Sequence, residues 1–326
     1  MAKNEEKKVL GMDREKFRMF MGKYGIGVIL LIMVVFISIM EPAFRSVNNM
    51  MNVATQVSIN AMIAYGMCLA ITTEGIDLSV GAQLALVSCI LGQLISNMGF
   101  GIVTAIIVAL LVSTAWGVVN GFLISKFSMF PFVVTLSTQL IIRGLAQLVS
   151  GGKAIPITDD AFKKIYSAKL GPIPFPILML ILATVVMYLI LHWTKFGRYV
   201  FAVGDNMQAA IASGVSIIKT KTATYAISGF LAGVAGIIFT AKTASAQSNI
   251  GVGYETDAVA ACVLGGTSFA GGVTTVPGVL MGIFIIGFIY NGMNMIGIDS
   301  YYQSMTKGAV IIGAVLLDMV MNKKNS

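Results

Sequence analysis

Apolar runs long enough to cross a bilayer recur along the whole chain, and they limit the possible folds more than any other feature. A transmembrane helix needs about 20 mostly apolar residues. Only 11% of the 326 residues are charged and 57% are hydrophobic, a balance that excludes a soluble domain of this size. The sequence therefore predicts an all-α polytopic membrane protein with about ten transmembrane helices. The expected spans are residues 24–40, 53–73, 79–97, 101–124, 131–149, 174–193, 222–242, 256–271, 273–294 and 301–320.

The basic residues predict how these spans are oriented. Cytoplasmic segments of membrane proteins carry an excess of Lys and Arg. Here Lys and Arg are concentrated in segment 1–23, loop 194–221 and the tail 321–326, which we therefore place in the cytoplasm. Loop 150–173 is expected outside, and residues 24–320 form one transmembrane domain. The net charge of +8 thus reflects membrane orientation and gives no reason to expect a nucleic-acid partner.

Two halves of the chain show similar features. Asn120 precedes a glycine near the end of one predicted span, and Asn291 does the same in the second half. Glycine interrupts segment 74–81 in one half and segment 265–272 in the other. With four spans per half and one span between them, the halves have opposite orientations. The pattern predicts two inverted-topology repeats with broken helices, in which the two Gly-broken segments face each other beside a transport pathway.

Loop 194–221 contains a short helix with a signal at each end. Asp205 or Asn206 can accept a hydrogen bond from the first free backbone N–H groups. Gly214 suits the left-handed residue that ends a helix. We therefore expect a helix over 205–214 at the cytoplasmic surface, either as a docking element for a soluble partner or as an ordinary interfacial amphipathic helix.

Charged and polar residues inside the predicted spans have competing interpretations. Asp77 is either the N-cap of the following helix or a carboxylate that binds an ion or proton. We expect Lys307 to pair with Asp299, and Arg143 and Lys242 to reach toward the membrane interface. The polar side chains either form interhelical hydrogen bonds or line a hydrophilic path. They are Gln56, Asn60, Asn120, Gln139, Asn291, Asn294 and Gln303.

Signatures of enzymes are missing from the sequence. The chain has one histidine, and its three cysteines lie in apolar surroundings without paired spacing, so we predict no catalytic residue and no metal site. Gly152-Lys153 is followed by Ala154 in place of Ser or Thr, which excludes a nucleotide-binding P-loop. If ATP drives transport, another polypeptide must hydrolyse it.

Three segments together resemble a known family. They read TTEGIDLSVGA from Thr72, GYETDAVAACVLGGTSFAGG from Gly253 and TKFGRYVFAVGDNMQAAIASGV from Thr194. The sequence is similar over nearly its whole length to the permease subunit of bacterial monosaccharide ABC importers, the ribose, galactose and xylose group. The C-terminal NGMNMIGIDSYYQ looks like ribose permeases, whereas AACVLGG followed by VPG looks like galactose permeases, so the sugar stays open.

The resemblance implies a multi-pass pore subunit of the bacterial cytoplasmic membrane. Its implied partners are a cytoplasmic ATPase that holds ATP and Mg, an external sugar-binding protein and a second copy of the chain. The 205–214 helix then becomes the coupling helix, with Ala209 and Ala210 exposed until the ATPase docks. The expected coupling residues are Gly204, Asp205, Asn206, Gln208, Ala209, Ala210, Ser213 and Gly214.

The pathway between the halves is expected to use polar and small residues of both repeats. A cation-coupled secondary sugar transporter is the alternative, in which Asp77 or Asp257 would bind the driving cation. The expected pathway residues are Asp77, Asn120, Gln139, Gly266, Thr267, Ser268, Asn291 and Asn294.

Overall fold

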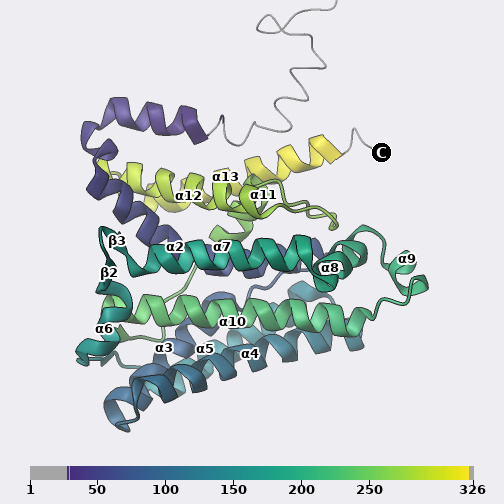
Figure 1. The fold of residues 1–326 in the computed structure, drawn as a ribbon, viewed down its shortest axis with the longest axis horizontal. Helices are drawn as coiled ribbons and strands as arrows, with labels where there is room; N and C mark the ends of the chain where they lie inside the picture. Colours follow the sequence, from purple (N-terminus) through teal and green to yellow (C-terminus); the bar gives the residue numbers. More distant parts are fainter. Residues whose placement is uncertain (1–27, 29, 323–326) are drawn as a thin grey trace, which may run out of the picture.

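Long helices build the structure, as the sequence predicts (Figure 1). The computed structural model describes residue 28 and residues 30–322. Within that part of the chain, seven helices are long and apolar enough to cross a membrane, which confirms the all-α membrane fold. They are α2 (Val47–Thr72), α3 with its π-helical end η2 (Val80–Gly92, Gln93–Asn97), α4 (Ile102–Lys126), α5 (Pro131–Ser150), α7 (Phe175–Trp193), α10 (Ile217–Thr243) and α12 (Val276–Met295).

Further helices and four short strands complete the described chain. Four two-residue strands form two small antiparallel pairs, β1 with β4 and β2 with β3. The strands are β1 (Ile155–Pro156), β2 (Lys169–Leu170), β3 (Ile173–Pro174) and β4 (Ser245–Ala246). The other helices are Leu30–Met40, η1 (Pro42–Arg45), α6 (Asp160–Ser167), α8 (Lys195–Asp205), α9 (Met207–Ala212), α11 (Tyr254–Leu264) and α13 (Ser300–Asn322).

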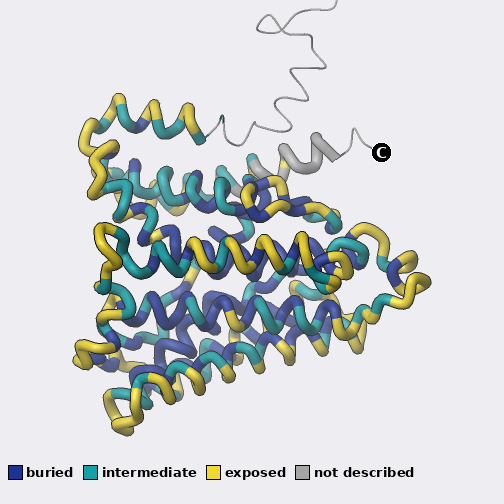
Figure 2. The backbone as a smooth tube through the Cα atoms, viewed as in Figure 1, coloured by how far each residue is buried: buried dark blue, intermediate teal, exposed yellow. Residues whose placement is uncertain are grey.

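Helix α2 lies at the centre of the bundle. Of the most apolar 18-residue stretch of α2, 83% of the residues are buried, against 22% in the corresponding stretches of α4 and α7. Figure 2 shows the same arrangement, with exposed residues along the outer helices and buried ones inside. Because the exposed faces of α4 and α7 are apolar, they suit contact with lipid.

The packing of the helices follows the predicted repeat. Helix α3 packs against α4, α5 and α10, and α11 packs in the same way against α12, α13 and α2. Helices α2 and α10 contact each other between the two groups. The series α2 to α5 therefore matches α10 to α13 element by element. Asn120 and Asn291 lie near the ends of the matching helices α4 and α12.

The matching of the glycine-broken segments needs a correction. The short helices α3 and α11 are each preceded by non-helical chain, residues 73–79 and residues 244–253. Segment 74–81 thus corresponds to the chain before α11, and 265–272 lies after it. The start of α3 and the chain before α11 come together at Gly81 and Gly251. A Cβ added to Gly81 would collide with the backbone carbonyl of Gly251. Glycine at both positions allows the backbones to approach closely.

The expected span 256–271 is wrong as one continuous helix. Helix α11 ends at Leu264, and Gly266 adopts a left-handed conformation with φ 82°. The chain then forms a loop until α12 begins at Val276. Glycine is unfavourable inside a helix, so the glycine-rich sequence after Leu264 favours a loop. Gly265 and Gly278 also allow the backbones of α11 and α12 to approach closely.

The predicted loops lie at opposite ends of the bundle. Helix α6, which belongs to loop 150–173, lies at one end, and α8 and α9 of loop 194–221 lie at the other (Figure 1). Helix α10 begins at Ile217, so the predicted loop ends earlier than expected. The predicted cytoplasmic segment 1–23 lies outside the described residues, as does most of the tail 321–326.

Candidate functional site

A polar cavity lies among the helices of the second half and α2. Its volume is about 340 Å³, which is within the range of small-molecule sites. Helices α2, α10, α11, α12 and α13 all contribute to its wall. The polar side chains that line it are Gln56, Asn60, Lys242, Tyr254, Asp257, Tyr290, Asn294, Ser300, Gln303, Ser304 and Lys307.

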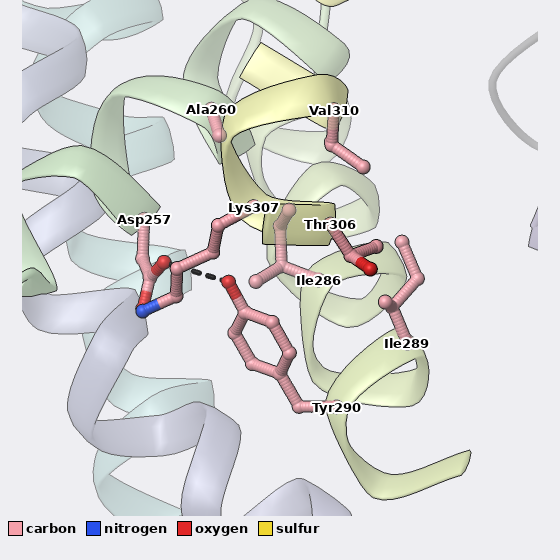
Figure 3. A pocket seen from close by; sticks show the side chains of 8 residues that line it. All are labelled: Asp257, Ala260, Ile286, Ile289, Tyr290, Thr306, Lys307 and Val310. Atoms are coloured by element: carbon pink, nitrogen blue, oxygen red, sulfur yellow. Dashed lines mark hydrogen bonds and ion pairs between the residues drawn. The ribbon is translucent and has the colours of Figure 1, made fainter. Parts of the chain in front are cut away.

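An ion pair lies in the wall of this cavity, and its residues also line a smaller adjoining pocket, which Figure 3 shows. Lys307 Nζ lies 2.9 Å from Asp257 Oδ2, and the Tyr290 hydroxyl donates to Asp257 Oδ1 at 2.9 Å. The Lys307 ammonium also lies 5.0 Å from the centre of the Tyr290 ring. The Asp257 carboxylate is thereby compensated on both oxygens, so it is not free to bind a driving cation.

The predicted partner of Lys307 is therefore wrong. Asp299 precedes α13 and is exposed, whereas Asp257 on α11 faces the Lys307 side chain directly. Sequence spacing favoured Asp299 because it is close along the chain. Only the packing of α11 against α13 brings Asp257 within reach.

Four of the seven amide side chains predicted to line a hydrophilic path do line the cavity: Gln56, Asn60, Asn294 and Gln303. Gln56 and Asn60 lie one turn apart on α2, and Gln303 donates to the Asn294 side-chain oxygen at 2.8 Å. The side-chain oxygen of Asn60 is buried and has no hydrogen-bond partner within the described chain.

Asp77 belongs to a different, fully buried cluster. Its Oδ1 accepts from the backbone N–H of Ser79 at 3.1 Å and from the Ser79 hydroxyl at 2.5 Å. Its Oδ2 accepts from the Ser228 hydroxyl of α10 at 2.8 Å. Asn120 donates to Ser79 Oγ at 2.9 Å, so both predicted pathway residues stabilise the broken helix. Asp77 is thus held by hydrogen bonds from Ser79 and Ser228, but it is not the N-cap of α3, because that position is Ser79.

The other predicted pathway residues are dispersed. Asn291 exchanges two hydrogen bonds with Asn49, at 2.8 and 3.0 Å. Gln139 is half-buried on α5 and does not line the cavity. Residues Gly266, Thr267 and Ser268 form the loop after α11, where the Thr267 hydroxyl lies 2.7 Å from that of Thr274. Of the eight predicted residues, Asn294 is the one placed at this cavity in the described chain.

Arg143 does not extend toward the interface as predicted. Arg143 Nη1 donates to the carbonyl oxygens of Ser248 and Ile250, at 2.7 and 2.6 Å. It therefore anchors the non-helical chain before α11 to α5. The Arg143 side chain thus finds polar partners inside the protein, which is where ionisable groups of membrane spans are usually found. Lys242 is exposed and is among the residues that line the polar cavity.

The helix predicted over 205–214 is present, with tighter bounds. Helix α8 runs to Asp205, and Asn206 caps α9 by accepting from the Ala209 N–H at 2.9 Å. Gly214 has φ 80°, the left-handed conformation expected of the residue that ends a helix. Helix α9 projects from the bundle at its edge (Figure 1).

Two predicted coupling residues are not available on the surface. Ala210 is only 4% exposed, so the prediction that it presents an open face is wrong. Gly204 is also buried, against the end of α2. Both lie on the side that holds α8 and α9 to the bundle. The exposed members of the predicted set are Asp205, Asn206, Gln208, Ala209, Ser213 and Gly214.

Comparisons with known proteins agree with this architecture. A family model described as "Branched-chain amino acid transport system / permease component" matches residues 49–315. The ribose import permease of Bacillus subtilis (strain 168) is 42% identical over 291 residues, 89% of this chain and 90% of that protein. The D-allose and galactose/methyl galactoside permeases of Escherichia coli (strain K12) are each 34% identical, over 94% of this chain and 94% and 97% of their own lengths. No solved structure matches the chain.

These similarities confirm the family resemblance inferred from the sequence motifs. They also cover the cavity, whose lining residues lie within the matched region. The chain is a multi-pass pore component of the bacterial cytoplasmic membrane and not an enzyme. It belongs to the family of transport-system permease components that is described for branched-chain amino acid transport.

Proposed function

We propose that this permease imports a monosaccharide, with ribose as the first candidate, in a complex driven by ATP. The relatives named for ribose, allose and galactose transport support a sugar as the substrate. The observation that carries the proposal is the 340 Å³ cavity lined by amides, hydroxyls and one ion pair. Sugar hydroxyls need donors and acceptors of this kind, and the cavity offers both.

The cavity suits passage better than tight retention. Most of its polar groups already have partners within the protein, as Gln303 has in Asn294 and Asp257 has in Lys307. A sugar must compete with these contacts, which limits its affinity. Weak binding at such a site allows the substrate to leave on the far side.

Energy has to come from partners, since the sequence has no nucleotide-binding loop. In the proposal a cytoplasmic ATPase holds ATP and Mg, an external binding protein delivers sugar, and two copies of the chain form the pore. Helix α9 is the docking element for the ATPase. Its exposed Gln208 and Ala209 combine a polar side chain with a small one, which lets a partner surface approach closely.

Uptake by the reconstituted complex tests the proposal. The permease, ATPase and binding protein are placed in proteoliposomes and offered labelled ribose, galactose, xylose and arabinose. We expect uptake of at least one sugar that requires ATP on the ATPase side and loaded binding protein on the other. Uptake driven by an ion gradient in the absence of ATP would instead establish the cation-coupled alternative.

A further inference from the structure

Three segments that are distant in sequence meet at Gly204, just before the turn into α9. Gly204 is buried in the last turn of α8. A Cβ at this position would overlap the carbonyl oxygen of Thr72 and lie 2.5 Å from the backbone nitrogen of Gly272. The end of α8 therefore fits against the end of α2 and the loop before α12 only because residue 204 has no side chain.

A hydrogen bond joins the other two segments. Thr72 is the last residue of α2, and the carbonyl groups in the last turn of a helix have no partner within the helix. The Thr72 carbonyl accepts from the Gly272 N–H at 3.0 Å. The chain leaves α2 through Glu74, whose φ of 58° is rare for a residue with a side chain.

The contacts around this point are made largely by backbone. A Cβ on Gly271 would lie 2.6 Å from the Gly204 carbonyl oxygen and 2.7 Å from Glu74 Cγ. A Cβ on Gly272 would lie 3.0 Å from the Asp205 Cα. Side chains can absorb a displacement by changing rotamer, whereas contacts between backbones cannot. The three segments are therefore expected to move together.

Each segment leads to a part of the bundle that transport has to move. The chain after Glu74 enters the buried cluster around Asp77, which is tied to α10 through Ser228. The chain after Gly272 begins α12, a wall of the polar cavity. On the other side of the contact, α9 follows α8 with only Asn206 between them.

We infer that Gly204, Thr72 and Gly272 form a rigid joint, the glycine joint. It passes displacements of α9 to the C-terminal end of α2 and to the start of α12. The inference rests on the proposed docking of an ATPase on α9. Gly204 is a positioning residue in this account, because it is buried away from both the ATPase surface and the cavity. Its role is to let the backbone of α8 contact the backbones of Thr72 and Gly272 directly, so that a movement of α8 displaces them as well.

Replacing Gly204 by alanine tests the joint in the reconstituted complex. We expect Gly204→Ala to retain the ATPase on purification and to hydrolyse ATP, while sugar uptake falls about tenfold or more because an overpacked contact must separate. The loss of coupling appears as a raised number of ATP molecules hydrolysed per sugar. Gly144→Ala is the matched control, since Gly144 is a helical glycine with open space around it. Normal uptake by Gly204→Ala at an unchanged ATP-to-sugar ratio would overturn the inference.

Cross-linking gives a second measurement that does not depend on the folding of Gly204→Ala. In the double variant Glu74→Cys/Asp205→Cys, both positions adjoin the 271–272 turn, and the native cysteines are buried. If the joint is rigid, a short bismaleimide across it leaves the uptake rate of the double variant unchanged. If the segments slide during transport, cross-linking stops uptake and the inference is wrong. Wild-type complex that fails to take up any sugar with ATP would contradict the proposed function instead.

Discussion

Lys307 and Asp257 join α13 to α11 through an ion pair of 2.9 Å at the wall of the polar cavity. The two side chains are unequally exposed, 29% for Lys307 and 7% for Asp257. Removing either partner therefore has different consequences. The lysine can turn toward the cavity when it loses the carboxylate, but the carboxylate has no comparable access to water.

We predict that Lys307→Met lowers the free energy of unfolding more than Asp257→Asn does. Leaving Asp257 buried with Tyr290 alone is expected to cost about 2 kcal/mol, less than for a fully buried pair because Lys307 is partly exposed. Thermal unfolding in detergent measures the difference. The double variant should regain part of the loss. Lys163→Met is the matched control, because it removes an exposed ion pair with Asp160 and should have little effect.

The Asp77 cluster is predicted to stabilise the broken helix before α3. Ser228→Ala removes the hydroxyl that donates to Asp77 Oδ2 and leaves a buried carboxylate oxygen without that partner. We expect a loss of about 1–3 kcal/mol in thermal unfolding. Ser167→Ala, which removes an exposed hydroxyl bonded within its own helix, serves as the control. Equal stability of the two variants would argue against a structural role for the cluster.

The exposed face of α9 is predicted to bind the ATPase. Ala209→Glu places a bulky charge there, so the folded permease should lose co-purification of the ATPase and sugar-stimulated ATP hydrolysis. Ala210 is unsuited to this test because it is buried. The same substitution at the exposed Ala161 of α6, at the opposite end of the bundle, should leave ATPase binding intact. Retention of the ATPase by Ala209→Glu would show that it docks elsewhere.

The predicted orientation can be measured with single cysteines. Lys163→Cys on α6 should react with an impermeant maleimide from outside the cell, and Lys219→Cys only after the membrane is permeabilised. The buried native cysteines Cys68, Cys89 and Cys262 should contribute little background. Labelling of both positions from the same side would contradict the orientation.

Features that depend on local sequence were predictable. Apolar length located the long helices, and the Asn206 and Gly214 signals located α9 because a cap acts within a few residues. The polar residues Gln56 and Asn60 were also identified as candidates for a path. Each of these depends on a property that a short stretch of chain carries by itself.

Features that depend on packing were missed. The pair of Lys307 with Asp257 and the contacts of Arg143 with the chain before α11 bring together residues that are far apart in sequence. The burial of Ala210 depends likewise on how α9 lies on the bundle. The matching of segment 74–81 also failed, because glycine-rich stretches occur both before and after α11 and only the helix contacts show which of them corresponds.

Blocking the cavity tests most directly whether sugar passes through it. Ser304 lines the cavity on α13, and Ser304→Cys is a small change that offers a reactive thiol. In the reconstituted complex, we predict near-normal ATP-driven uptake by Ser304→Cys before modification and at least about tenfold slower uptake after a bulky maleimide fills the space. Wild-type complex treated with the same reagent should be unaffected. Undiminished sugar uptake by fully modified Ser304→Cys would contradict the account.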